Sequence, residues 1–136
     1  MDLAKVMMIS ASGMSAQTMR LRTISENLAN ADSLGETPGA QPYARKMVTF
    51  KNVLDKKLEA KVVKIDKITK DPSDFQKRFD PQHPAADKDG YVLTPNVNSL
   101  IELMDMRQAQ RSYEANLSVI EVSKGMVART LDILRG

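Results

Sequence analysis

Mostly apolar side chains follow an unbroken spacing of three and four residues through the last third of this chain, from Leu103 to Leu134. Residues that recur about every 3.5 positions form a narrow stripe along one face of an α-helix. Such a stripe is shielded from water only when another helix covers it. We call this series the C-terminal seam, and its members are Leu103, Met106, Gln110, Tyr113, Leu117, Ile120, Lys124, Val127, Leu131 and Leu134.

A weaker series with the same spacing, including two polar positions, occupies the first thirty residues. It predicts an N-terminal helix from about Leu3 to Ala31, which must end before the glycines and prolines that begin at Gly35. Gly13 either lets a neighbouring helix approach closely or is only a tolerated weak point in this helix. The members of this N-terminal seam are Met7, Ser10, Met14, Gln17, Leu21, Ile24 and Leu28.

Two members of the C-terminal seam, Gln110 and Lys124, are polar where apolar side chains would pack best. Polar groups at such positions lower stability and can specify helix register and the number of partners. Alternatively, both side chains lie at the wet edge of the seam. The pattern leaves these two readings open.

Two seam-bearing helices at opposite ends of 136 residues predict a fold that is mainly α with a small β insert. The long N- and C-terminal helices should pack as an antiparallel, coiled-coil-like pair, joined by a central irregular and β-hairpin segment. We expect the N-terminal helix within residues 1–34, the central segment within 35–95 and the C-terminal helix within 96–136. Aromatic residues are scarce, at 4% with no Trp, which favours helix–helix packing over the compact core of an enzyme.

The central segment begins with two runs rich in β-branched residues, Tyr43–Leu54 and Lys57–Ile68. Apolar and charged residues alternate in the second run, with one slip of phase. This pattern predicts two half-buried strands, joined as a hairpin with a bulge. We expect Phe75 and Phe79 to pack against this unit.

The segment from Asp80 to Pro95 has too many prolines for a regular helix. Asp89-Gly90 predicts a turn, and Tyr91 begins a short extended piece. The last helix then starts near several N-cap candidates, among which Ser99 and Glu102 have the spacing of a capping box.

The chain has a net charge of +3, and its basic residues concentrate in the central segment. Residues 43–79 contain eleven Lys or Arg against five Asp or Glu. This surplus describes either a solvated face or a surface for an anionic partner. A basic, helical nucleic-acid-binding protein is therefore an alternative function, although the lysines lack interleaved stacking aromatics and no reader motif is present.

Reactive side chains are few. There is no Cys, and His83 is the only histidine, which we expect to fix a turn rather than to catalyse a reaction. We therefore predict no enzyme activity, no metal site, no cofactor and no small-molecule substrate. The apolar run Val6–Ile9 is too short for the core of a signal peptide, and no apolar stretch is long enough for a membrane span, so we expect neither feature.

Three segments, in order, resemble the flagellar basal-body rod proteins, and among them the proximal rod proteins. The first contains Gly13-Met14, Ala16-Gln17, Arg20-Leu21 and the run Asn27–Ala31, although Asp32-Ser33 replaces the Asn-Thr often found next. The third lies in the C-terminal helix and includes Glu102, Asp105, Tyr113 and Asn116. The second is the most specific; we call it the motif loop, and its marker residues are His83, Pro84, Gly90, Tyr91, Pro95, Asn96 and Asn98.

The resemblance implies a structural subunit of the rod, the drive shaft between rotor and hook, located in the periplasmic part of the basal body. It implies passage through the flagellar type III export apparatus without a cleaved signal peptide. Its partners would be further copies of the chain, other rod proteins and the base-plate adaptor. The terminal helices would pack with those of neighbours to form a tube, and we expect the assembly interface to comprise the C-terminal seam together with Met14, Leu21, Ile24, Asn27, Leu28 and Asn30.

Overall fold

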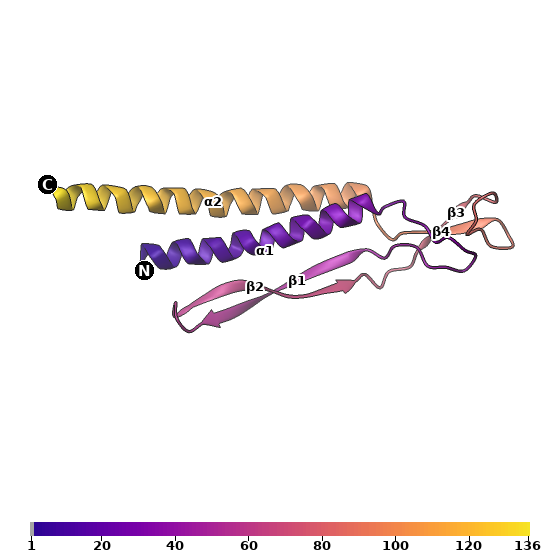
Figure 1. Ribbon diagram of the computed structural model, residues 1–136, viewed down its shortest axis with the longest axis horizontal. Helices are drawn as coiled ribbons and strands as arrows, with labels where there is room; N and C mark the ends of the chain where they lie inside the picture. The colour runs from indigo at the N-terminus through magenta and orange to yellow at the C-terminus, as the bar shows by residue number, and fades with distance from the viewer. Residues whose placement is uncertain (1) are drawn as a thin grey trace. The chain divides into compact units, whose positions relative to one another are not determined.

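The computed structural model describes residues 2–136, which form two long helices and four strands (Figure 1). In chain order the elements are α1 (Leu3–Ala29), β1 (Lys46–Asp55), β2 (Ala60–Lys70), β3 (Gln76–Phe79), β4 (Tyr91–Thr94) and α2 (Ser99–Arg135). The strands form two separate two-stranded sheets, β1–β2 and β3–β4. The prediction of a mainly helical fold with a small β insert is confirmed.

The chain divides into two compact units, each built from segments that are distant in the sequence. The first unit combines the residues up to Leu21 with Val48–Lys67 and Arg107–Gly136. The second combines Arg22–Met47 with Ile68–Met106. Within the described part of the chain, neither helix is long and apolar enough to cross a membrane.

In the first unit, α1 and α2 run side by side in opposite directions (Figure 1). Gly13 lies against Asn116, and Arg20 Nη2 donates to Gln108 Oε1 at 3.2 Å. Later residues of α1 therefore contact earlier residues of α2. This is the predicted antiparallel pairing of the terminal helices.

The face of α2 that α1 covers in this unit is centred on small and polar residues. Ala109 and Ser123 are buried, and Asn116 is half-buried. These positions repeat every seven residues, and each lies one residue before a member of the C-terminal seam. Small side chains allow two helices to approach closely, so α1 packs here rather than over the leucines. As a result, α1 reaches only one edge of the seam.

The close approach is tightest at Gly13. A Cβ atom added there would lie 2.8 Å from Asn116 Nδ2, which is shorter than real contacts allow. Of the two interpretations of Gly13, the structure therefore favours close approach of a neighbouring helix over a merely tolerated weak point, and a methyl group added there would have to displace the Asn116 amide.

We expect Gly13→Leu to lower the free energy of unfolding by about 1–3 kcal/mol, because the larger side chain forces the helices apart. Urea denaturation followed by circular dichroism measures this loss. The matched control is Gly13→Ala combined with Asn116→Ala, which leaves room for the new methyl group and should retain most of the stability. Equal losses in the two variants would show that the crossing does not depend on the space at Gly13.

The β1–β2 hairpin packs on α1 within the same unit, and the predicted hairpin is confirmed. Val62 is buried, and Val63 and Ile65 of β2 line a groove shared with Ser12 and Ala16 of α1. The predicted bulge stays a prediction. Lys51 of β1 pairs with Asp66 of β2 across the hairpin at 3.2 Å.

The second unit contains a sheet that the sequence pattern did not predict. Strands β3 and β4 pair antiparallel, with Phe79 opposite Tyr91 and Gln76 opposite Thr94. The rings of Phe79 and Tyr91 meet edge to face at a centroid distance of 5.3 Å. Phe79 therefore has a ring partner within its own sheet, and the expectation that Phe75 and Phe79 pack against the first hairpin stays a prediction.

In the second unit, asparagine side chains cap the end of α1 and the start of α2. At the end of α1, Asn30 Nδ2 donates to the Glu26 carbonyl oxygen at 2.8 Å, and the helix ends at Ala29, two residues before the predicted limit. At the start of α2, Asn98 Oδ1 accepts the backbone N–H groups of Leu100 and Ile101. Asn98 is therefore the N-cap, and the predicted capping box of Ser99 and Glu102 was wrong, because Glu102 is used elsewhere.

Candidate functional site

An ion cluster around the buried carboxylate of Glu102 lies within the second unit, and we call it the Arg45 cluster. The Arg45 guanidinium contacts three carboxylates, one through each nitrogen: Nε donates to Glu102, Nη1 lies 3.3 Å from Asp71, and Nη2 lies 3.6 Å from Asp105. Glu102 is fully buried, with 0% of its surface exposed. Burying a charged carboxylate costs free energy unless it is paired and hydrogen-bonded, so Glu102 depends on this arginine.

Asn27 joins the cluster to the end of α1 and the start of β1. Its Nδ2 donates to the Lys46 carbonyl oxygen at 2.9 Å and to Glu102 Oε2 at 3.2 Å. Its Oδ1 accepts the Lys46 N–H at 2.9 Å and the Tyr43 hydroxyl at 2.8 Å. All four hydrogen-bonding positions of the amide are therefore filled, which explains how a side chain only 1% exposed can be polar.

Two further polar residues complete this region. Asn96 Oδ1 accepts the backbone N–H of Arg45 at 2.7 Å, and its Nδ2 donates to the carbonyl oxygens of Asp71 and Ser73. Burial raises the pKa of the Tyr43 hydroxyl, so this group remains protonated and keeps donating to Asn27. The cluster thus connects α1, β1, the segment between β2 and β3, and α2 within the second unit.

Asp71 gives the cluster a dependence on pH. The backbone N–H of Ser73 donates to Asp71 Oδ1 at 2.8 Å and, with the Ser73 hydroxyl and Arg45, lowers the Asp71 pKa below its ordinary value of 3.8. A lowered pKa stabilises the folded chain above the pKa of the unfolded chain and loses this effect as the pH falls through the folded value.

We therefore expect the free energy of unfolding to fall more steeply below about pH 4 in the natural chain than in Asp71→Asn. Urea titrations at several pH values measure both profiles. Asp74→Asn, at an exposed aspartate nearby, is the matched control and should follow the natural chain. Indistinguishable acid profiles for the natural chain and Asp71→Asn would rule out this contribution.

Most marker residues of the motif loop lie in the second unit as parts of turns and caps. The backbone N–H of Ala85 donates to His83 Nδ1 at 3.0 Å, so His83 holds a turn, as expected. Gly90 has a φ of 84°, a conformation that favours glycine. Pro95 is buried, whereas Pro84 and Tyr91 are exposed.

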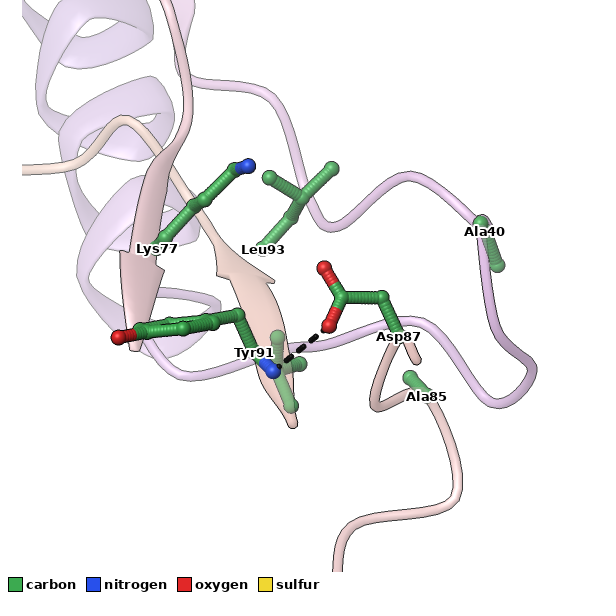
Figure 2. A pocket seen from close by; sticks show the side chains of 8 residues that line it. Ala40, Lys77, Ala85, Asp87, Tyr91 and Leu93 are labelled. Atoms are coloured by element: carbon green, nitrogen blue, oxygen red, sulfur yellow. Dashed lines mark hydrogen bonds between the residues drawn. The ribbon is translucent and has the colours of Figure 1, made fainter. Parts of the chain in front are cut away.

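A small pocket lies beside the β3–β4 sheet, and Figure 2 shows the Asp87 carboxylate and the Lys77 ammonium at its rim. Its volume is about 200 Å³, and its lining includes Ala85 and Leu93. That volume is below the roughly 300–1,000 Å³ of typical ligand sites. Asp87 accepts the backbone N–H groups of Tyr91 and Asp89, both at 2.9 Å, and the first of these bonds contributes most to lowering the Asp87 pKa. The Asp87 carboxylate therefore stabilises the turn and is a poor proton donor.

Among residues 2–136, no group of three or more His, Cys, Asp or Glu side chains is placed to hold a metal ion.

The predicted interface residues separate into a covered and an exposed set. On α1, Ile24 and Asn27 are buried within the second unit, and the other predicted members are half-buried. On α2, Met106, Tyr113, Ile120 and Val127 are half-buried. The exposed set consists of Leu103, Gln110, Leu117, Lys124, Leu131 and Leu134.

No sequence signal indicated a role for Arg45, Tyr43 or Asp71, which the structure brings into or beside the Arg45 cluster of the second unit. Each is an ordinary polar residue in a segment that reads as strand or loop. Asn27, Asn96 and Glu102 lie within the segments that carry the resemblance, and this was the available signal.

Two family models match the chain at its two ends. The one described as "Flagella basal body rod protein" matches residues 7–41, and the one described as "Flagellar basal body rod FlgEFG protein C-terminal" matches residues 88–133. These segments contain most of α1, most of α2 and part of the motif loop. The matches define the class of flagellar rod subunits.

Relatives along nearly the whole chain are more specific. The flagellar basal-body rod protein FlgC of Agrobacterium fabrum is 52% identical over 127 residues, covering 93% of this chain and 91% of the relative. FlgC of Bacillus subtilis is 38% identical, covering 92% and 93%. FlgC of Salmonella typhimurium is 35% identical, covering 98% of both.

The chain belongs to the FlgC family of flagellar basal-body rod proteins. It is a structural subunit of the rod, located in the flagellar basal body, where it assembles with other flagellar proteins. The family is structural rather than enzymatic, so the predictions of a rod subunit and of no enzyme are confirmed. The alternative of a nucleic-acid-binding protein has no support in these matches.

Proposed function

We propose that this subunit polymerises through its terminal helices to form part of the tube of the proximal rod. The observation that carries the proposal is the set of leucines that α1 leaves uncovered on α2. Leu117 is 37% exposed and Leu131 is 50% exposed, although both follow the spacing of a helix–helix contact. A helix from a neighbouring subunit is the partner that this spacing fits.

Energetics support a contact of this kind. Burying a large apolar side chain contributes about 1.5–3 kcal/mol. In the single chain, Leu103, Leu117, Leu131 and Leu134 contribute only part of that amount, since each remains exposed. Packing against a neighbour recovers the rest, so assembly stabilises both partners.

The covered members of the predicted interface have a supporting role in this proposal. Ile24 and Asn27 hold α1 within the second unit, and the half-buried residues of α1 orient it along α2. Direct contact with neighbours then belongs to the exposed set on α2. Gln110 and Lys124 lie among those leucines, where polar side chains specify the register of the contact.

The expected neighbours are further copies of the chain, other rod proteins and the base-plate adaptor. We infer that the chain reaches the periplasmic part of the basal body through the flagellar type III export apparatus, in an unfolded state. The absence of cysteine fits this route, because no crosslink can form in transit. Folding is completed on incorporation, when neighbours cover the exposed leucines.

Hydrogen exchange tests the coupling of folding to assembly. We expect amides near the start of α1 and the end of α2 to exchange rapidly in the purified chain, since few buried contacts hold them. Amides of the second unit near the Arg45 cluster serve as the internal control and should be protected longest. The same terminal amides should become protected in isolated basal bodies. Full protection of both termini in the free chain would argue for a self-sufficient domain instead.

A further inference from the structure

A second apolar surface runs along α2, on a different side of the helix from the exposed leucines. Its residues follow the spacing of three, four and seven positions that places side chains on one helix face. All are exposed, from 40% at Val119 to 78% at Ile133. We call this surface the valine face; it comprises Val119, Val122, Met126 and Ile133.

The valine face and the exposed leucines lie on different sides of the helix. Successive residues of an α-helix are rotated by roughly 100°, so five residues turn the helix by about 140° beyond a full circle. Val122 follows Leu117 by five residues and therefore points to another side. Leu117 and Leu131, together with the polar Gln110 and Lys124, form what we call the leucine face.

The two faces have borders of opposite charge. Glu114 and Glu121 lie three residues before and four residues after Leu117, so they flank the leucine face. Arg129 lies seven residues after Val122 and flanks the valine face. These three charged side chains are exposed, and none forms an ion pair within residues 2–136.

Each face also continues into a groove beside the first turn of α1. On the valine side, Leu3 and Val6 of α1 form a groove of about 380 Å³ with Val119, Val122 and Met126. On the leucine side, Leu3 and Met7 form a groove of about 330 Å³ with Val127 and Leu131. Each groove is open and apolar enough to take a side chain from a neighbouring helix.

We propose that the leucine face of one copy packs against the valine face of the next copy, a head-to-tail contact between two different surfaces. This inference rests on the proposed polymerisation. It brings the acidic border of one copy beside the arginine border of its neighbour. A symmetric contact of leucine face on leucine face would bring Glu121 of both copies together, which costs free energy.

A contact between two different surfaces leaves one of each surface free on every pair. The next copy can therefore always add, and the contact repeats along an open helical array. A symmetric contact closes after two copies. The two non-equivalent faces of α2 thus fit a subunit that adds one copy after another.

Engineered cysteines distinguish the two arrangements, because the chain contains no natural cysteine. We would place Leu117→Cys, Val122→Cys, or both in the full chain, assemble basal bodies in cells and oxidise the purified structures. The double variant should convert into a ladder of linked copies, and each single variant should remain monomeric. A dimer from Leu117→Cys alone, or links only to other proteins, would overturn the proposal.

A charge exchange provides an independent readout. Glu121→Arg should reduce incorporation about tenfold, because two arginines then meet at the border. Adding Arg129→Glu in the same chain should restore incorporation, since the exchanged charges meet on adjacent copies. Failure of this rescue would overturn the head-to-tail arrangement.

The outcomes also separate this inference from the proposed function. If the natural chain is absent from the tube of purified basal bodies, the proposed polymerisation fails. If the chain is present there but Leu117→Cys links two copies through equivalent faces, only the head-to-tail pairing fails.

Discussion

Glu102→Ala is expected to lower the free energy of unfolding by about 2–4 kcal/mol, because it leaves a buried N–H of Asn27 without an acceptor and the half-buried Arg45 guanidinium with two carboxylates instead of three. The substitution removes the carboxylate that pairs with Arg45 Nε and accepts from Asn27 Nδ2. Native domains are stable by about 5–15 kcal/mol, so this loss is a large fraction of the stability of the second unit. Urea denaturation of the purified chain, followed by circular dichroism, measures the change.

Two variants make this result specific to the cluster. Glu114→Ala removes an exposed glutamate from the same helix and should change the stability by less than about 0.5 kcal/mol. Glu102→Gln keeps the shape and part of the hydrogen bonding, so its loss should be smaller than that of Glu102→Ala. A loss below about 1 kcal/mol for Glu102→Ala would mean that solvent or other groups readily replace the carboxylate.

Leu117→Lys is expected to abolish incorporation into the rod and, with it, swimming. The substitution places a charge in the proposed contact, where a neighbouring helix would bury it without a partner. Because Leu117 is exposed in the single chain, the purified variant should unfold at nearly the same urea concentration as the natural chain. Motility in soft agar and the amount of the chain in purified basal bodies measure the effect.

Leu117→Met is the matched control, since it keeps an apolar side chain of similar volume and should swim normally. Normal swimming of Leu117→Lys would remove this residue from the interface. Loss of both folding and swimming would instead indicate a role within the single chain.

The helices could be predicted from the sequence because their signal is repeated over many turns. The spacing from Leu103 to Leu134 lies entirely within α2, and the predicted start of α1 at Leu3 agrees with the structure. The hairpin of β1 and β2 was also predicted, since long strands carry several alternations. The four-residue strands β3 and β4 are too short to show a period, so their pairing was missed.

The side of α2 that contacts α1 could not be predicted from hydrophobicity. The pattern marks leucines as the preferred contact, yet α1 packs over Ala109, Asn116 and Ser123. Two helices can approach closely only where their side chains are small. A rule that scores only apolar character does not take the size of side chains into account. The leucines are left for other contacts.

The Arg45 cluster was missed for a different reason. Sequence spacing assigned Glu102 to a capping box because Ser99 precedes it by three residues. Whether a carboxylate caps its own helix or pairs with a distant arginine depends on tertiary structure, which brings Arg45 and Glu102 together across 57 residues. Asn27 and Asn96 likewise use their amides on backbone groups far away in the chain.

The fully satisfied amide of Asn27 has a consequence for the proposed export of the chain. Three of its four hydrogen bonds are with Tyr43 and Lys46, but in the fourth Asn27 Nδ2 donates to Glu102. A polypeptide that emerges with its N-terminus first presents the first two partners early and the last one late. Until residue 102 emerges, Arg45 also lacks the buried carboxylate of Glu102. The partly exported chain therefore cannot form the stable interior of the second unit. The missing hydrogen-bond and ion-pair partners therefore disfavour premature folding of the chain.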